Sequence, residues 1–247
     1  MPERITPTDA DWWPDYGWEH LQRYAFATRY CTSGHGLDFG CGVGYGTEIL
    51  ARSGATTMTG VDIDAAIIAA ALDREHPVNA TFQTSLETAT AEVPAGFDFA
   101  VMFEVIEHLR EPRAVLAELA DRLKPGGLLI VSAPNKLRFT GAPDPLANDW
   151  HLSEPTYADL HAWVSDRFDV IGEYEQSDLR LDSLDYVVGT LQRSWVLRLE
   201  RGLRRLFGRP LVIPPPADLL VRKTDILPLI LERRGICRQF IFVARRR

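Results

Sequence analysis

The stretch at residues 35–46, H-G-L-D-F-G-C-G-V-G-Y-G, decides how this chain folds. A short apolar lead ends in Asp38, and Gly40, Gly42 and Gly44 then follow at every second position. Glycine has no Cβ, so the backbone can turn tightly from a strand into a helix and lie directly against a ligand. The stretch therefore predicts a strand, a glycine-rich turn and a helix that together hold a cofactor.

Strand patterns and helix patterns alternate along the rest of the chain. Strands are predicted near residues 56–61, 79–83, 97–103 and 128–135, and helices between them, one of which is capped by Asp64. Two further strands are predicted at 167–175 and 237–245. Such alternation is typical of an α/β fold with a doubly wound parallel sheet, which binds ligands at the carboxyl ends of its strands.

The composition is that of an ordinary globular protein. Hydrophobic residues make up 46% of the 247 residues and charged residues 25%, so one large α/β domain with an insertion accounts for the length. The net charge of -7 argues against a general nucleic-acid-binding surface. The 3 cysteines form no close pair, and no signal-like or membrane-spanning apolar run occurs, so we expect a cytoplasmic protein.

Four motifs occur in a fixed order: D-F-G-C-G-V-G at 38–44, E-V-I-E-H-L at 104–109, L-K-P-G-G at 123–127 and S-A-P-N at 132–135. Together they resemble the class I methyltransferases that depend on S-adenosyl-L-methionine (SAM). The resemblance covers roughly residues 18–175. It is strongest to a group that includes ubiquinone-pathway O-methyltransferases, sugar and natural-product methyltransferases, and small-RNA 2′-O-methyltransferases. It implies a Rossmann-like sheet of seven strands, mostly parallel with an antiparallel last strand.

The cofactor would lie across the ends of the first strands. Asp62 follows Gly44 by 18 residues, close to the spacing of about 20 at which an acid meets ribose hydroxyls. A carboxylate suits this place because it can accept hydrogen bonds from both hydroxyls. The resemblance further implies contacts with the methionine end, the adenine and a covering N-terminal helix. The expected cofactor residues are Tyr24, Asp38, Gly40, Gly42, Gly44, Asp62, Ile63, Ser85, Leu86 and Glu104.

A group of acids and imidazoles follows the fourth strand. Glu104, Glu107 and His108 are spaced so that a helical turn would point them to one side, where they could bind a divalent ion such as Mg²⁺. The resemblance to metal-binding relatives adds His151 as a fourth ligand. In the alternative, Glu107 and His108 only anchor the following helix. Without a metal, His108 or His151 is the best general base, because an imidazole titrates near neutral pH.

The chain is predicted to be one domain over residues 1–247, with a cap helix at about 12–30. An insertion at about 176–235 is too long for a simple loop, and we expect it to form a lid over the acceptor or a homodimer contact. Within it, residues 193–209 show a basic amphipathic pattern. That pattern suits peripheral membrane contact but is more typical of an ordinary surface helix.

The predicted function is methylation of a hydroxyl on a small molecule, with a sugar, a glycan precursor or another biosynthetic intermediate as the acceptor. One alternative is 2′-O-methylation of RNA with a divalent metal. The other is a non-catalytic SAM-binding regulatory subunit, which would lack an acceptor pocket and a base near the methyl group.

Overall fold

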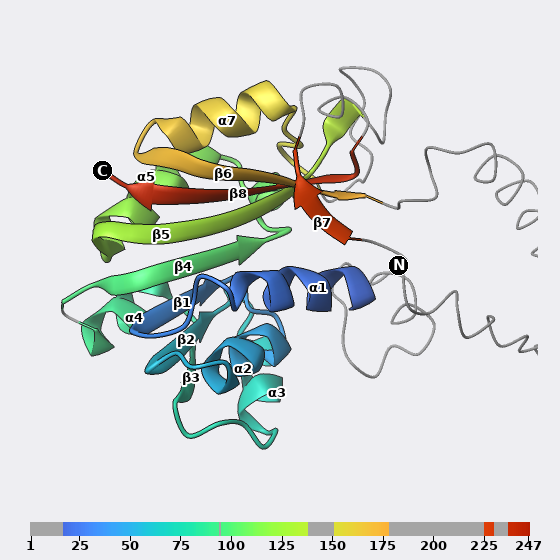
Figure 1. Cartoon of the computed structure of the whole chain (residues 1–247). Helices are drawn as coiled ribbons and strands as arrows, with labels where there is room; N and C mark the ends of the chain where they lie inside the picture. Colours follow the sequence, from blue (N-terminus) through green and yellow to red (C-terminus); the bar gives the residue numbers. More distant parts are fainter. Residues whose placement is uncertain (1–16, 94, 138–150, 178–224, 230–236) are drawn as a thin grey trace, which may run out of the picture. The chain divides into compact units, whose positions relative to one another are not determined.

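The computed structural model describes residues 17–93, 95–137, 151–177, 225–229 and 237–247 (Figure 1). The chain divides into two units, residues 1–176 with 226–247, and residues 177–225. The second unit lies almost entirely outside the described residues, as does most of the predicted insertion. The basic segment 193–209 lies wholly outside them. Predictions about a lid, a dimer contact or a membrane contact therefore stay predictions.

One sheet of eight strands runs through the first unit, in the order β3-β2-β1-β4-β5-β8-β6-β7 (Figure 1). Strands β1 to β5 pair in parallel, and β8 pairs antiparallel with both β5 and β6. The strands are β1 (His35–Phe39), β2 (Thr57–Val61), β3 (Ala80–Gln83), β4 (Phe97–Phe103), β5 (Leu123–Pro134), β6 (Phe168–Ser177), β7 (Asp225–Pro228) and β8 (Gln239–Arg246).

This arrangement confirms the predicted Rossmann-like sheet and its antiparallel last strand. The seven expected strands are all present. Strand β7 is an eighth, short strand at the edge, which the sequence pattern did not predict. Its four residues fall inside the predicted insertion and carry too little periodicity to indicate a strand.

Helices cover both faces of the sheet. They are α1 (Trp18–Ala27), α2 (Tyr45–Arg52), α3 (Ala65–Leu72), α4 (Leu86–Glu92), α5 (Pro112–Arg122) and α7 (Tyr157–Ser165). Asp64 caps α3 as predicted, because its carboxylate accepts hydrogen bonds from the amides of Ala66 and Ile67. Helix α1 lies within the predicted cap helix, whose first residues fall outside the described part of the chain. In the described residues, no helix is long and apolar enough to cross a membrane.

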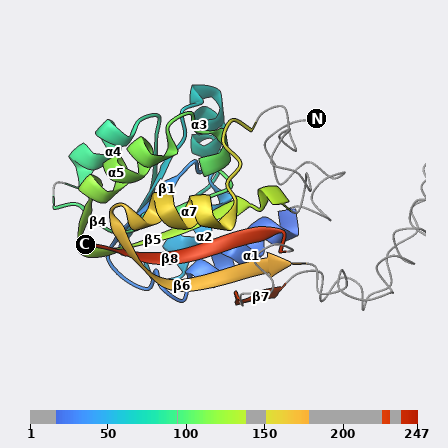
Figure 2. The ribbon, with the colours of Figure 1, turned by 90° about the horizontal axis from the view of Figure 1, so that it is seen from above.

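The core consists of two main layers, one on each face of the sheet. In β4, Ala100 and Met102 face the layer formed with α4, α5 and α7. Val101 and Phe103, which alternate with them, face the layer formed with α1 and α2 (Figure 2). Because both faces are covered, the central strand is apolar at successive positions. Polar groups gather instead where the parallel strands end, and there the chain turns from β1, β2 and β4 into loops that carry the predicted site.

Candidate active site

The glycine loop after β1 shows which glycines serve the fold and which leaves room for a ligand. A Cβ on Gly40 would meet Val105 at 2.3 Å, and one on Gly44 would meet Phe82 at 2.5 Å. Packing therefore requires glycine at these two positions. A Cβ on Gly42 would meet nothing within 4 Å, although its φ of +54° still favours glycine. Gly42 is thus the position at which the loop is open to a bound molecule.

Asp38, at the carboxyl end of β1, is completely buried beneath this loop. The hydroxyl of Tyr24 donates to its carboxylate at 3.0 Å, and the hydroxyl of Thr47 donates at 2.7 Å. Burial raises the pKa of Asp38 to about 6, the two hydrogen bonds oppose that rise, and the nearby charge of Asp62 adds to it. The structure therefore places two of the predicted cofactor residues, Tyr24 and Asp38, in contact with each other, together with Thr47.

Asp62 follows β2 and closes the other side of the glycine loop. One carboxylate oxygen accepts from the amide of Gly42 at 3.1 Å, and the other accepts from the amide of Asp64 at 3.0 Å. These two bonds fix the plane of the carboxylate. The next side chain, Ile63, is 89% exposed. A fixed carboxylate next to an exposed apolar side chain would suit a nucleoside. The ribose hydroxyls could donate to the carboxylate, and the base could lie on the apolar side chain.

The predicted adenine residues have clear structural roles. The Ser85 hydroxyl accepts a hydrogen bond from the amide of Thr88 at 3.2 Å and thereby caps α4. Leu86 is buried in the core at the start of the same helix. Both residues lie just beyond β3, the neighbour of β2, so they stand at the edge of the sheet where the cofactor site was predicted.

Two arginines near this site were missed by the sequence analysis. Arg74 donates to the carbonyl oxygen of Val43 in the glycine loop at 2.9 Å and pairs with Glu48 at 3.2 Å, so it braces the loop against α2. Arg23 of α1 is only 1% exposed and donates to Gln176 at 2.6 Å. Burial raises the pKa values of Tyr45 and Glu107, and the positive charge of Arg23 opposes both rises, so Arg23 lies near both the glycine loop and the turn after β4.

A buried arginine is rare unless its charge is matched, so Arg23 is a further candidate residue of the site. The signal in the sequence was its position beside Tyr24 on a helix predicted to cover the cofactor.

Glu104 stands at the end of β4 with an uncommon backbone conformation. Among the described residues it alone has a positive φ without being glycine, at 54°. Such strain is typical of functional positions. The carboxylate of Glu104 accepts a hydrogen bond from the hydroxyl of Ser132 at 2.7 Å. The backbone amide of Glu104 donates to the hydroxyl oxygen of Ser132 at 3.2 Å. Ser132, the first residue of the S-A-P-N motif, thus holds Glu104 in place.

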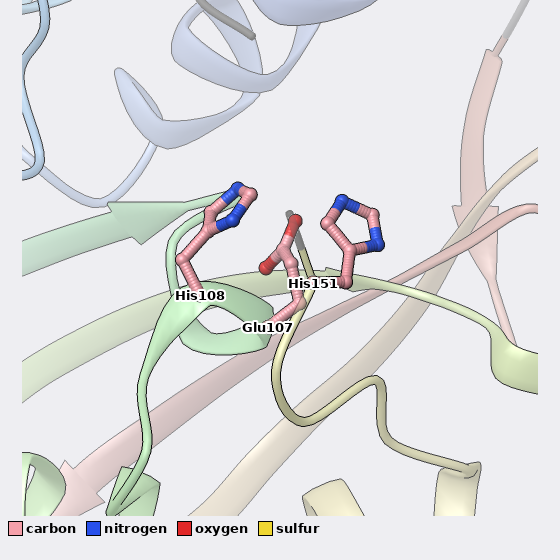
Figure 3. A group of neighbouring side chains, drawn as sticks. All are labelled: Glu107, His108 and His151. Carbon is pink, nitrogen blue, oxygen red and sulfur yellow. The ribbon is translucent and has the colours of Figure 1, made fainter. Parts of the chain in front are cut away.

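Three of the four predicted metal ligands come together, namely Glu107, His108 and His151. Their ligand atoms all lie within 4.8 Å of one another, and the two imidazole rings meet edge to face with centroids 4.9 Å apart. Figure 3 shows the Glu107 carboxylate directed into the space between the two rings. Glu104 is not a member of this group. The 3-10 turn at Ile106–His108 presents Glu107 and His108, whereas the Glu104 side chain turns toward β5.

His151 reaches this group because its segment is docked on the 3-10 turn. The amides of Leu152 and Ser153 donate to the carbonyl oxygen of Glu107 at 2.7 and 2.9 Å. The Ser153 hydroxyl lies within hydrogen-bonding distance of the carbonyl oxygens of Ile106, at 3.0 Å, and Leu109, at 2.8 Å. These contacts join residues more than forty positions apart. They bring His151 to the site that the resemblance had implied.

The electrostatics of this corner are dominated by acids. Glu107 is 1% exposed, and burial raises its pKa well above the ordinary value. The neighbouring charges of Glu104 and Glu154 raise this pKa further, while Arg23 lowers it. Glu154, which the sequence analysis did not single out, has a fully buried side chain in contact with the His151 ring. The acids and imidazoles around Glu107 can therefore accept protons or bind a cation.

Comparison with known proteins agrees with this geometry. A family model described as "Methyltransferase domain" matches residues 18–183. A probable S-adenosylmethionine-dependent methyltransferase of Mycolicibacterium smegmatis is 33% identical over 141 residues, 57% of this chain and 54% of that protein. A ubiquinone biosynthesis O-methyltransferase of Xanthomonas campestris is 36% identical over 105 residues, 40% of this chain and 43% of that protein. The chain thus spans about half the length of the curated relatives it matches.

A solved SAM-dependent methyltransferase from Thermotoga maritima shares the fold, with a TM-score of 0.61 and 14% identity over 96% of this chain and 93% of that one. Fold and glycine loop together define a class I SAM-dependent methyltransferase. The chain belongs to the methyltransferase domain family. The family match and the relatives also support SAM as the cofactor.

Proposed function

We propose that this chain transfers the methyl group of SAM to a hydroxyl of an uncharged small molecule, with a sugar or glycan precursor as the leading acceptor class. The observation that carries the proposal is the group formed by Glu107, His108 and His151 at the carboxyl end of β4. It supplies two imidazoles beside the predicted cofactor site, which is what deprotonation of a hydroxyl requires. The ubiquinone-pathway relative, named an O-methyltransferase, is consistent with this choice.

The residues around the glycine loop fit the cofactor. SAM, when bound, supplies a methyl group on a positively charged sulfur, and its methionine end carries an ammonium and a carboxylate. Asp38 offers the negative charge and Arg23 the positive charge for such an end. Asp62 offers carboxylate oxygens for the ribose hydroxyls, and the exposed Ile63 offers an apolar surface for the adenine. A ligand in this place would fill the open space above Gly42.

The proton of the acceptor hydroxyl is transferred to an imidazole in the proposed reaction. As the acceptor oxygen forms its bond to the methyl carbon, the bond from that carbon to sulfur breaks, and S-adenosylhomocysteine leaves. The hydroxyl proton moves to a ring nitrogen of His108 or His151, so the ether product and the protonated imidazole account for all atoms and charges. The protein contributes by aligning the acceptor in line with the methyl group and by accepting this proton.

The acidic surroundings favour an uncharged acceptor. Burial raises the pKa of Glu107, and the negative charges of the neighbouring Glu104 and Glu154 raise it further. A phosphate-rich acceptor such as RNA would be repelled by them, whereas sugar hydroxyls can donate hydrogen bonds to them. This supports the small-molecule proposal over RNA methylation.

A divalent ion is compatible with the same group. Two imidazole nitrogens and one carboxylate oxygen suit a borderline ion such as Zn²⁺ or Mn²⁺ better than Mg²⁺, which prefers oxygen ligands. With Glu104 outside the group, the sequence-based preference for Mg²⁺ loses its basis. Glu107, His108 and His151 would hold such an ion, which would polarise the acceptor hydroxyl.

The test is methyl transfer from isotopically labelled SAM to a panel of sugars, glycosides, phenols and short RNAs, with and without a chelator. We expect His108→Ala and His151→Ala to lower turnover by about 100-fold or more while the affinity for S-adenosylhomocysteine is unchanged. The control is His161→Ala on α7, whose side chain is 41% exposed.

Labelling of RNA alone would overturn the proposal in favour of the RNA alternative. Cofactor binding without labelling of any acceptor would favour the regulatory alternative.

A further inference from the structure

A second carboxylate, that of Glu154, lies behind the imidazole group. Its side chain is completely buried, and one of its oxygens contacts Nδ1 of His151. The His151 ring extends from this contact toward Glu107 and His108 (Figure 3). Glu154 thus touches the group through His151 and lies outside the set that could bind an ion or an acceptor.

The contact with Glu154 determines which ring nitrogen of His151 carries the proton. A carboxylate only accepts hydrogen bonds, so Nδ1 must be the donor. In a neutral imidazole the other nitrogen, Nε2, then has the lone pair and can accept a proton or bind an ion. The alternative tautomer would place a proton on Nε2 and a lone pair against a buried carboxylate, which is unfavourable.

The backbone restrains the same segment independently. Leu152 and Ser153 are hydrogen-bonded to the 3-10 turn, so both the position of Glu154 and that of His151 are fixed relative to Glu107. A carboxylate held in this way orients the ring as well as its proton. Comparable carboxylate partners of ligating or catalytic histidines change activity or metal affinity by about 10- to 100-fold.

We propose that Glu154 is the positioning residue of this site: its carboxylate holds His151 with the proton on Nδ1 and presents Nε2 to the acceptor side. The role rests on the proposed function only in that Nε2 is used there, as a base or as a ligand. The tautomer itself is a property of the folded chain and can be measured without an acceptor.

The decisive measurement is the tautomer of His151 by nitrogen NMR on protein labelled in its 6 histidines. The signals of His151 are assigned from their loss in His151→Gln. In the wild type we expect a protonated Nδ1 and an unprotonated Nε2. In Glu154→Leu we expect the signals to shift toward the mixture of an ordinary imidazole, and in Glu154→Gln to shift less, because the amide oxygen can still accept. The other histidines report whether the fold is intact.

The matched control is Glu173→Gln. Glu173 lies 3.7 Å from Nε2 of His161, so this change should move the signals of His161 and leave those of His151 unchanged. A proton on Nε2 of His151 in the wild type, or unchanged His151 signals in Glu154→Leu, would overturn the proposal.

Kinetics provide the second readout once an acceptor has been identified. The single variant Glu154→Leu should turn over about 10-fold or more slowly than the wild type. Added to His151→Ala, the same change should cause no further loss, because Glu154 acts through His151. An equal loss in both backgrounds would show a merely structural role. If no acceptor is methylated but the tautomer depends on Glu154, the proposed function fails and the positioning role stands.

Discussion

The two halves of the site are built in different ways. The cofactor half consists of the loops after β1 and β2, whose polar groups are matched locally: Asp38 accepts from Thr47 and Tyr24, and Asp62 accepts from backbone amides. The acceptor half consists of the turn after β4 and the docked segment 151–154. There burial and the neighbouring charges of Glu104 and Glu154 raise the pKa of Glu107. Hydrogen bonds thus hold the two acids of one half, whereas the other half brings several acids and imidazoles together.

This difference indicates what each half is for. A preformed cradle binds a cofactor of constant shape with little reorganisation. Crowded acids and imidazoles are arranged for chemistry, because perturbed pKa values mark groups that exchange protons or bind cations. Changes in the cofactor half should therefore lower cofactor affinity, whereas changes in the acceptor half should lower turnover and can even stabilise the fold.

The largest effect is expected for Gly42→Val. The new side chain would point into the open space above the loop, where the cofactor is proposed to lie, and would strain a backbone with φ of +54°. We expect the affinity for S-adenosylhomocysteine, measured by calorimetry, to fall by more than about 100-fold.

Gly126→Val separates the effect of strain from that of lost space. Gly126 also has a positive φ, +78°, and open surroundings, but it lies at the opposite end of β5. It should destabilise the protein by about 1–2 kcal/mol and leave cofactor affinity unchanged. If the wild type and Gly42→Val bind S-adenosylhomocysteine with equal affinity, the cofactor does not lie above the glycine loop as proposed.

Asp38→Asn tests the matched charge of the cofactor half through pH. The folded-state pKa of about 6 lies above the ordinary value of 3.8, so this group favours the folded state at low pH. That contribution is complete below about pH 4 and is lost as the pH rises through about 6.

The pKa shift corresponds to about 3 kcal/mol. As the pH rises from 4 to 7, the wild type should lose roughly this much free energy of unfolding, whereas Asp38→Asn should not lose it. Denaturant titrations at the two pH values measure it, and calorimetry should show weaker binding of S-adenosylhomocysteine by the variant. A difference between variant and wild type that does not change with pH would contradict the raised pKa.

The cofactor half could be predicted from sequence because its parts are contiguous or recur at known spacings. Asp38, Gly42 and Asp62 lie at the ends of successive strands, and parallel strands bring those ends together. Even there, the sequence did not distinguish Gly42 from Gly40 and Gly44, because packing against Val105 and Phe82 depends on distant segments.

The acceptor half was predictable only in part. The spacing of Glu107 and His108 placed them on one turn, but the carboxylate of Glu104 is hydrogen-bonded to Ser132 on β5 and is not part of the group. Arg23, Ser153 and Glu154 were missed because their roles arise from long-range contacts that no local pattern encodes.

Arg23→Lys tests whether Arg23, which lies near both halves, contacts the methionine end of the cofactor. Lysine keeps the charge but loses the planar donors of the guanidinium, so the contact with a carboxylate at the methionine end weakens. We expect about a 10-fold loss of affinity for S-adenosylhomocysteine and little loss for 5′-methylthioadenosine, which lacks that end.

Arg74→Lys provides the contrast, since Arg74 braces the loop itself. It should weaken both ligands equally. If Arg23→Lys also weakens both equally, Arg23 supports the loop and does not contact the methionine end.

The smallest effect is expected for Glu107→Gln. Burial raises the pKa of Glu107, and the charges of Glu104 and Glu154 raise it further. Stability contributed by this group at low pH is therefore lost as the pH rises. Glu107→Gln removes this ionisable group, so its free energy of unfolding at pH 8 should exceed that of the wild type by an amount on the order of 1 kcal/mol.

Denaturant titration measures this gain, and Glu118→Gln on α5, with a side chain 51% exposed, should change stability by no more than about 0.5 kcal/mol. Turnover should fall in Glu107→Gln while cofactor affinity stays the same. A loss of stability in Glu107→Gln would mean that interactions within the fold stabilise the carboxylate of Glu107. The acids of the two halves would then be held in the same way, and the contrast between the halves would no longer hold.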